Sequence, residues 1–254
     1  MNEFLLRSLI SGSIAIVLYL VSGSIVSRYW NRKVNRDVFR HDFKWGIASL
    51  IVGSPILQGF SVLAETHGIS LLYTEFAGYG WLWWVLSLPI YILLWDLVFY
   101  LGHLVLHMPW VYKKSHFRHH ACRPPVPWSG IAIDPLETLL SGILPYVLPL
   151  FILPFHVYTV YALNIGLMVW ATVVHSSMNF VGNSVWLSTK DHNLHHAYGL
   201  KNFNLGAVFT FWDRIGGTLN RKVSPPWWGN NNWRINTKAS VNGPALAEDA
   251  SDAS

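Results

Sequence analysis

Two long stretches of the chain contain no lysine or arginine, and this absence constrains the fold more than any other feature of the sequence. One lies between Lys44 and Lys113, the other between Arg123 and Lys190. Both contain apolar runs of the length that a helix needs to cross a bilayer, about 20 residues. Since 52% of all residues are hydrophobic and only 12% are charged, we predict an all-α integral membrane protein.

The apolar runs predict about four membrane-spanning helices. Runs over 5–26 and 45–64 give the first two spans, and a run of about 20 residues from Trp81 gives the third. The apolar segment 139–174 is broken near Pro154, which favours a hairpin. If both halves of the hairpin cross the membrane fully, the number of spans becomes five.

The charges between the spans predict the topology. Residues 28–44 are expected to form a loop rich in lysine and arginine, and the positive-inside rule places such a loop in the cytoplasm. Residues 65–80 carry two glutamates and no cation, so they are expected on the other side with His67 and His156. The membrane is either a bacterial inner membrane or the endoplasmic reticulum.

Eight of the 12 histidines fall into three short boxes that are expected together on the cytoplasmic side. Neutral imidazole is the commonest metal ligand among side chains, and helix residues three or four apart share a face. The adjacent pair in an HxxHH box diverges by about 100°, so each member can reach a different metal. We therefore predict a histidine-rich di-metal cap with these ligands: His103 and His107 (HxxxH), His116, His119 and His120 (HxxHH), and His192, His195 and His196 (HxxHH).

Four further residues are candidates for the site. His175, after the hairpin, is a predicted ligand, although a lone histidine can also be an ordinary core residue, and Asn179 lies one helical turn later. Asp96 and Tyr100 share a helical stripe with the first box. Asp96 is expected to orient a ligand histidine or to bind backbone groups, since an ionisable residue in a span is costly. The alternatives are an interfacial aspartate that reaches water and an ordinary interfacial tyrosine.

The remaining composition excludes several classes of protein. The single cysteine, Cys122, excludes an internal disulfide framework and a multi-cysteine metal cluster. The +5 net charge is spread over the connections between spans and not along one stripe, so nucleic acid is not an expected partner. We predict one domain over 1–228, with the histidine-box core at 92–220, and a polar, disordered tail over 229–254.

Several motifs between about residues 92 and 220 occur together in one order. They are Trp95-Asp96 and Tyr100 before the first box, both HxxHH boxes, His175 after the hairpin, and the WDRIGGT segment at 212–218. With these motifs the chain resembles the fatty acid hydroxylase and sterol desaturase superfamily of membrane di-iron oxygenases, and within it the chain looks most similar to sterol C-5 desaturases. It departs from their pattern at Leu104, where they have arginine, and at Asp134, where they often have histidine before a proline.

The resemblance implies two non-haem iron ions that use dioxygen to oxidise a sterol-like membrane lipid by desaturation or hydroxylation. Spacing alone equally permits zinc, copper or nickel. Electrons would come from a separate ferredoxin, cytochrome or reductase. This donor could dock on a group of basic residues, although the same residues could equally face anionic lipid. These residues are Lys113, Lys114, Arg118 and Arg123. The alternatives are a fatty-acyl or other lipid hydroxylase, a zinc-dependent membrane hydrolase and a metal transporter.

Overall fold

The computed structural model describes residues 3–30, 36–76, 78–176, 178 and 183–228. The predicted tail over 229–254 and Asn179 lie outside the described residues. Within the described part, four helices are long and apolar enough to cross a membrane, which confirms the predicted four-span all-α architecture. They are α1 (Glu3–Tyr29), α2 (Arg36–His67), α3 (Gly80–Leu106) and α7 (Val157–Val174).

The predicted basic loop over 28–44 is wrong for most of its length. Helix α1 continues to Tyr29 and α2 already begins at Arg36, so several of the cations lie on helix. The early turns of α2 are held by tertiary packing, because Val38 belongs to a buried cluster that also contains Trp128 from a short 3-10 helix much later in the chain. Hydropathy marks the apolar part of a span only, whereas a helix that finds packing partners extends beyond it.

The first half of the predicted hairpin is not a full span, so the count stays at four. Pro145 and Pro149 lack a backbone N–H and interrupt regular helix geometry. Gly102 lets this limb approach α3, because a Cβ there would lie 2.5 Å from the carbonyl oxygen of Leu140. The limb is a succession of short helical pieces: α5 (Pro135–Glu137), the π-helix η3 (Thr138–Ile143), α6 (Leu144–Val147) and the 3-10 helix η4 (Leu148–Phe151).

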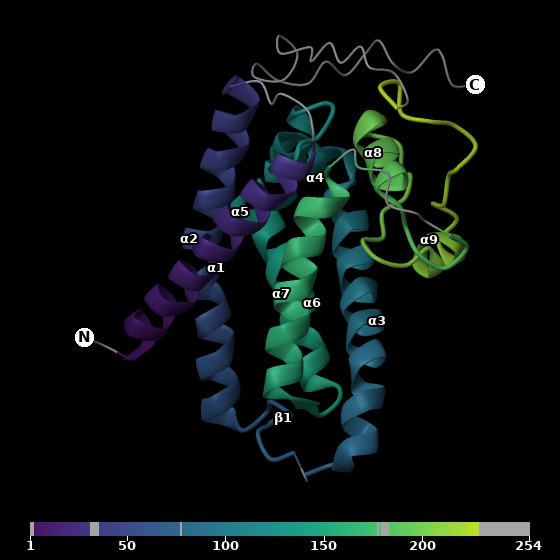
Figure 1. Cartoon of the computed structure of the whole chain (residues 1–254). Helices are drawn as coiled ribbons and strands as arrows, with labels where there is room; N and C mark the ends of the chain where they lie inside the picture. The colour runs from purple at the N-terminus through teal and green to yellow at the C-terminus, as the bar shows by residue number, and fades with distance from the viewer. Residues whose placement is uncertain (1–2, 31–35, 77, 177, 179–182, 229–254) are drawn as a thin grey trace.

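One end of the bundle is closed by a short parallel sheet. Strand β1 (Leu72–Tyr73), between α2 and α3, pairs with β2 (Phe155–His156), which leads into α7. Figure 1 places this sheet at the end of the bundle far from α4 (Pro109–Lys114) and α8 (Thr189–Ala197). His156 therefore lies far from the second HxxHH box on α8, as the predicted topology requires.

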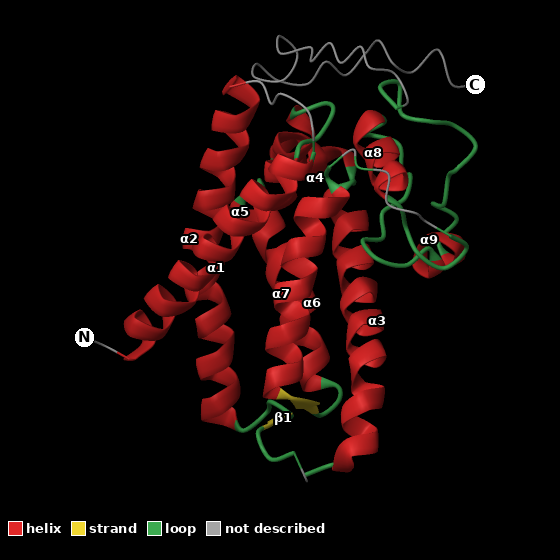
Figure 2. Ribbon diagram, viewed as in Figure 1, coloured by secondary structure: helices red, strands yellow, loops and turns green. Residues whose placement is uncertain are grey.

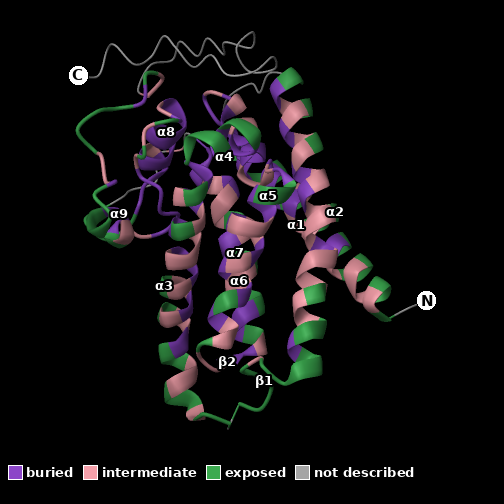
Figure 3. Ribbon diagram, turned by 180° about the vertical axis from the view of Figure 1, so that it is seen from behind, coloured by how far each residue is buried: buried purple, intermediate pink, exposed green. Residues whose placement is uncertain are grey.

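The other end is covered by short helices and loops that connect or follow the spans (Figure 2). They include α4, the 3-10 helices η1 (His116–Ala121) and η2 (Pro127–Ile131), α8 and α9 (Phe211–Ile215). Figure 3 shows that most of α8 is buried, although this helix is polar in sequence. A polar helix that is buried must satisfy its side chains inside the protein, so this cap is the place to look for a site.

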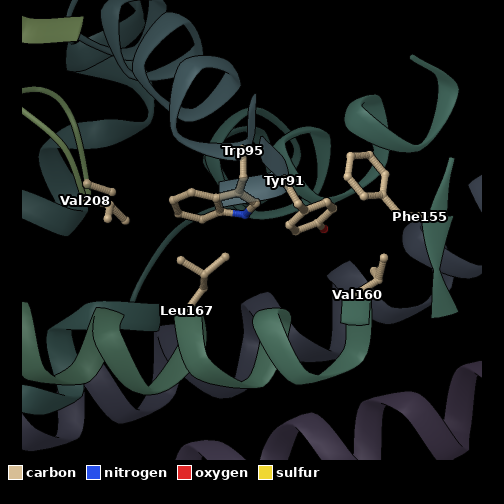
Figure 4. Close-up of a cluster of buried hydrophobic side chains, with 7 residues drawn as sticks. Tyr91, Trp95, Phe155, Val160, Leu167 and Val208 are labelled. Atoms are coloured by element: carbon tan, nitrogen blue, oxygen red, sulfur yellow. The ribbon is translucent and has the colours of Figure 1, made fainter. Parts of the chain in front are cut away.

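The core below the cap is an apolar and aromatic layer between α3 and α7. Figure 4 shows Tyr91 and Trp95 of α3 facing Val160 and Leu167 of α7. Phe155 lies at one end of this cluster, and Val208 from the cap lies at the other. The layer therefore links the lipid-spanning part of the protein to the underside of the cap.

Candidate metal centre

Five histidines from three segments, the end of α3, η1 and α8, converge on one point at the cap end of α3. His103 lies in the last turn of α3 and His107 follows as its C-cap residue. The Nε2 atom of His116 lies 3.0 Å from that of His103, 3.1 Å from that of His107 and 3.0 Å from that of His120. We call this set the five-histidine group; it comprises His103, His107, His116, His120 and His195.

Four more histidines converge beside the first set, at the end of α7. His175 is the C-cap residue of α7, and its Nε2 atom lies 2.9 Å from that of His192 and 3.2 Å from that of His119. The Nε2 atoms of His192 and His196 are 3.1 Å apart. We call this set the four-histidine group; it comprises His119, His175, His192 and His196.

The two groups lie side by side and divide the HxxHH boxes between them. The rings of His119 and His196 approach the rings of the five-histidine group, with 4.5 Å between the centroids of His120 and His196. In each box, one member of the adjacent pair belongs to each group: His120 and His195 to the five-histidine group, and His119 and His196 to the other. All nine predicted histidines are thus brought together in two neighbouring sets.

The donor atoms fit metal ions better than they fit mutual hydrogen bonds. The Nε2 atom of His116 has three Nε2 neighbours at 3.0–3.1 Å, yet a neutral imidazole nitrogen can donate or accept only once in its ring plane. Nitrogens that share a metal at about 2.1 Å lie about 3 Å apart when their bonds are near right angles. The observed spacing is therefore that of ligands around a common ion.

Backbone carbonyls fix which ring nitrogen carries the proton in three of the histidines. The Nδ1 atoms of His103, His175 and His195 lie 2.7, 2.7 and 3.0 Å from the carbonyl oxygens of Leu205, Ala171 and Phe203. A carbonyl only accepts, so each Nδ1 donates and each Nε2 keeps its lone pair for a metal. The Nε2 of His195 has no hydrogen-bond partner among the described residues.

Burial keeps these imidazoles neutral. No ring in either group is more than 6% exposed. Loss of hydration lowers the pKa of His119 to about 4, and it lowers the pKa of the other group members outside the spans well below the usual value. These are His107, His116, His120, His175, His192, His195 and His196. At neutral pH, the rings are in the form that binds metal.

Glu137 is a site residue to which the sequence analysis assigned no role. Its Oε1 atom lies 2.9 Å from Nδ1 of His116 and 4.0 Å from Nδ1 of His119, one histidine from each group. It is 2% exposed, and its Oε2 atom has no partner among the described residues. The sequence feature that could have pointed to Glu137 is the Asp134-Pro-Leu-Glu137 motif. Asp134 accepts from the N–H of Glu137 and caps this turn.

Asp96 makes no direct contact with a ligand histidine. Its carboxylate is fully buried and accepts hydrogen bonds from three consecutive backbone N–H groups, those of residues 207–209, at 2.9–3.0 Å. The other expected role, binding of backbone groups, is the one observed. The alternative of an aspartate that reaches water is wrong.

Tyr100 also lies away from the two groups. Its hydroxyl is 3.1 Å from the hydroxyl oxygen of Thr218, which in turn donates to Asp213 at 2.6 Å. Because Thr218 uses its only hydroxyl proton for Asp213, Tyr100 donates to Thr218. Tyr100 therefore joins α3 to the WDRIGGT segment and has no metal-facing contact among the described residues.

Arg118 and Arg123 are occupied by internal contacts, which weakens their predicted role in docking. Arg118 binds Asp134 at 3.0 Å and its guanidinium lies over the ring of Trp45. Arg123 approaches the carbonyl oxygens of His120 and Ala197. Of the four basic residues predicted to receive a donor, Lys113 and Lys114 are the exposed ones.

A third set of metal-type side chains lies next to the cap, in His41, Asp42 and Cys122. Cys122 donates to Asp42 at 3.1 Å, Ser129 donates to its other oxygen at 2.6 Å, and Nδ1 of His41 lies 2.9 Å from the first oxygen. Burial raises the pKa of the Cys122 thiol. Hydrogen bonds thus satisfy this carboxylate, and the set is explained as a link between α2 and the loop after the first HxxHH box.

The sequence of the chain is similar to those of several known enzymes. Over 221 residues the chain is 28% identical to a Delta(7)-sterol 5(6)-desaturase of Gibberella zeae, covering 83% of this chain and 67% of that protein. It is 33% identical to such an enzyme of Schizosaccharomyces pombe (65% and 54% covered) and 30% identical to a lathosterol oxidase of Rattus norvegicus (64% and 55% covered). The chain thus spans about half to two thirds of these relatives. No solved structure matches it.

A family model described as fatty acid hydroxylase matches residues 88–218. The matched segment begins within α3, contains all nine histidines and ends at Thr218, so it covers the whole candidate centre and more than half of the chain. The chain belongs to the fatty acid hydroxylase family.

Proposed function

We propose that this protein uses dioxygen to oxidise a carbon–hydrogen bond of a sterol-like membrane lipid at two iron ions held by the nine histidines. The observation that carries the proposal is the pair of adjoining, buried histidine groups at the cap end of membrane-spanning helices. Relatives named as sterol desaturases and lathosterol oxidase support a sterol-like substrate. Iron is taken from the family, because imidazole ligands also accept other metals.

When bound, two irons supply the activation of dioxygen with electrons from a separate donor. The protein's own contribution is to bind, to orient and to exclude water. Five histidines would hold one ion and four the other, each with neutral rings. The cap covers them, since α8 and the first HxxHH box are buried. A water-poor pocket protects a reactive oxidant from side reactions.

The position of the groups supports oxidation near the polar end of the lipid. His103 lies in the last turn of α3 and His175 caps α7, so the metals would lie where the spans leave the hydrocarbon. A lipid that keeps its polar group at the interface presents its neighbouring carbons at this depth. A sterol carries its hydroxyl on the ring system, so its ring carbons meet this requirement.

An aromatic wall leads from the spans to the five-histidine group. Phe99 stacks on Trp95 with 5.3 Å between ring centroids and meets the ring of His103 edge-on at 5.2 Å. Trp95 itself is buried in the core cluster, so these rings join the packed core to the centre. A fatty-acyl hydroxylase remains the alternative within the family.

Rivals from other classes are disfavoured by the same geometry. A metal transporter needs its ligands near the middle of the membrane, whereas these histidines lie at helix ends. A zinc-dependent hydrolase would use similar ligands, and metal analysis of active protein separates it from an oxygenase. We further propose that the centre faces the cytoplasm and receives electrons from an acidic donor near Lys113 and Lys114.

The test is lipid analysis of cells with and without the protein under isotopically labelled dioxygen, with His120→Ala as the matched inactive control. A desaturase gives a sterol that has lost two hydrogens and carries no label, and a hydroxylase gives one with a labelled oxygen. Products confined to straight-chain lipids would refute the sterol substrate only. Activity of an iron-free, zinc-loaded protein without dioxygen would refute the oxygenase.

A further inference from the structure

Five consecutive backbone N–H groups in the cap all donate to two buried carboxylates. Asp213 accepts from Leu205 at 2.7 Å and from Gly206 at 2.9 Å. Asp96 accepts from the next three residues, 207–209. Both carboxylates have 0% exposure. We call residues 203–209 the brace loop, because its path is set by these two side chains.

The carbonyl groups of the brace loop face ligand histidines. The carbonyl oxygen of Leu205 accepts from His103, and that of Phe203 accepts from His195. Both histidines belong to the five-histidine group. In a helix or strand, these carbonyls would bond to other backbone groups. A loop whose N–H groups are bound by carboxylates leaves its carbonyls available for imidazole protons.

The two carboxylates come from distant parts of the chain and are themselves held in place. Asp96 lies on α3, two turns before His103, so one helix carries both a support of the loop and a ligand that the loop holds. Asp213 lies on α9 and accepts from Thr218, which Tyr100 of α3 binds. The WDRIGGT segment is thereby fastened to α3 around the brace loop.

We propose that Asp96 and Asp213 are positioning residues for the five-histidine group. Through the brace loop they hold His103 and His195 with their Nδ1 protons on carbonyls and their Nε2 lone pairs toward one metal. Partners of this kind, one shell beyond the ligands, change metal affinity by about 10–100-fold when they are mutated. The inference rests on the proposed function, since it assumes that the histidines bind metal.

The brace loop contacts histidines of the five-histidine group only, so the metal affinity of each group can be tested separately. In the full-length chain, the substitutions His192→Ala and His196→Ala leave only the five-histidine group intact, and His116→Ala and His120→Ala leave only the other group. Each background is titrated with Co²⁺, whose absorption spectrum reports histidine coordination. In Asp213→Asn, the amide N–H₂ faces a backbone N–H that donates to the carboxylate in the native protein. Two donors then face each other, and this disturbs the brace loop.

We expect Asp213→Asn to weaken Co²⁺ binding about 10–100-fold in the background that keeps the five-histidine group, with no change in the other background. Asp96→Asn should act in the same direction. Asp42→Asn is the matched control: it is also a buried carboxylate, and none of its described contacts involves the brace loop. It should not affect the five-histidine background.

Equal weakening in both backgrounds, or none in either, would overturn the inference while leaving the proposed function intact. Failure of both backgrounds to bind Co²⁺ would overturn both. If Asp213→Asn does not fold, Thr218→Val decides, because it removes the hydroxyl that donates to Asp213 and accepts from Tyr100 and leaves the carboxylate in place. It should weaken Co²⁺ binding several-fold in the five-histidine background alone.

Discussion

The two HxxHH boxes have the same pattern in sequence and opposite shares in the two histidine groups. The first box, on the 3-10 helix η1, gives two histidines to the five-histidine group and one to the four-histidine group. The second box, on α8, gives one and two. The HxxHH pattern therefore lets a box contribute histidines to both groups. The surrounding structure decides which group receives two of them and which receives one.

The boxes also differ in what supports them. In the first box, the carboxylate of Glu137 faces Nδ1 of His116. The second box sits on a regular α-helix whose start is fixed by reciprocal bonds between Ser188 and Asp191, and Asp191 is paired with Arg221 at 2.6 Å. The first box thus depends on a carboxyl group that faces a ligand ring, whereas the second depends on the stability of its helix and on the brace-loop carbonyl that holds His195.

The largest expected effect comes from removing one ligand from each box. His120→Ala and His196→Ala should each lower turnover by more than about 100-fold, beyond the range of residues that only support a ligand. His196→Ala leaves three histidines in its group and should reduce bound metal from about two ions per chain to about one. His120→Ala leaves four histidines in its group and should weaken binding of that metal without abolishing it. His67→Ala, at the far end of α2, is the control and should keep both ions.

Glu137→Gln should lower the metal affinity of one histidine group more than that of the other, because Glu137 supports the first box only. The amide is close in size but can turn its N–H₂ group toward Nδ1 of His116, where the Glu137 oxygen now lies at 2.9 Å, so we expect metal affinity of the five-histidine group to fall about 10–100-fold. The four-histidine group should change less, because His119 is farther from Glu137. Unchanged affinity at both groups, measured by Co²⁺ titration in the two ligand-deleted backgrounds, would contradict this role.

Acid should destabilise the metal-free protein. The pKa of His119 is about 4 in the folded state, below the usual 6.5, so the unfolded chain binds the proton more strongly between these values. Folding stability is then intact above pH 6.5 and falls as the pH drops toward 4. His119 alone accounts for a loss on the order of 3 kcal/mol. Thermal unfolding across this range checks it; a flat profile would contradict the burial argument.

The smallest effect is expected at the start of α8. Ser188→Ala removes the side chain that accepts from the N–H of Asp191 and should cost about 1 kcal/mol of stability. The first box should be unaffected and the brace loop still holds His195, so the five-histidine group keeps its metal affinity. Chemical unfolding together with metal analysis tests this. A selective loss at the five-histidine group would mean that the boxes do not have separate supports.

Much of the fold followed from the sequence, because its signals are local. The length and apolarity of a span are properties of one segment, so the four spans and the opposite location of His156 were predictable. The structure of the first half of the hairpin, residues 135–151, was harder to predict. An apolar run has the same composition in a full span as in a succession of short α, π and 3-10 helices. The shape of this half depends on prolines and on the close approach to α3 at Gly102.

By itself, the sequence determined that nine histidines would gather at the cap end of a membrane bundle, because the box spacing and the hydropathy of the spans are both encoded in neighbouring residues. Only the tertiary structure decided which group each histidine joins, that Glu137 lies between the groups, and that Asp96 and Asp213 hold one loop. The physical reason is that a buried carboxylate takes whatever donors the fold brings to it. The donors of Asp96, the N–H groups of residues 207–209, are more than a hundred residues away from it in the chain.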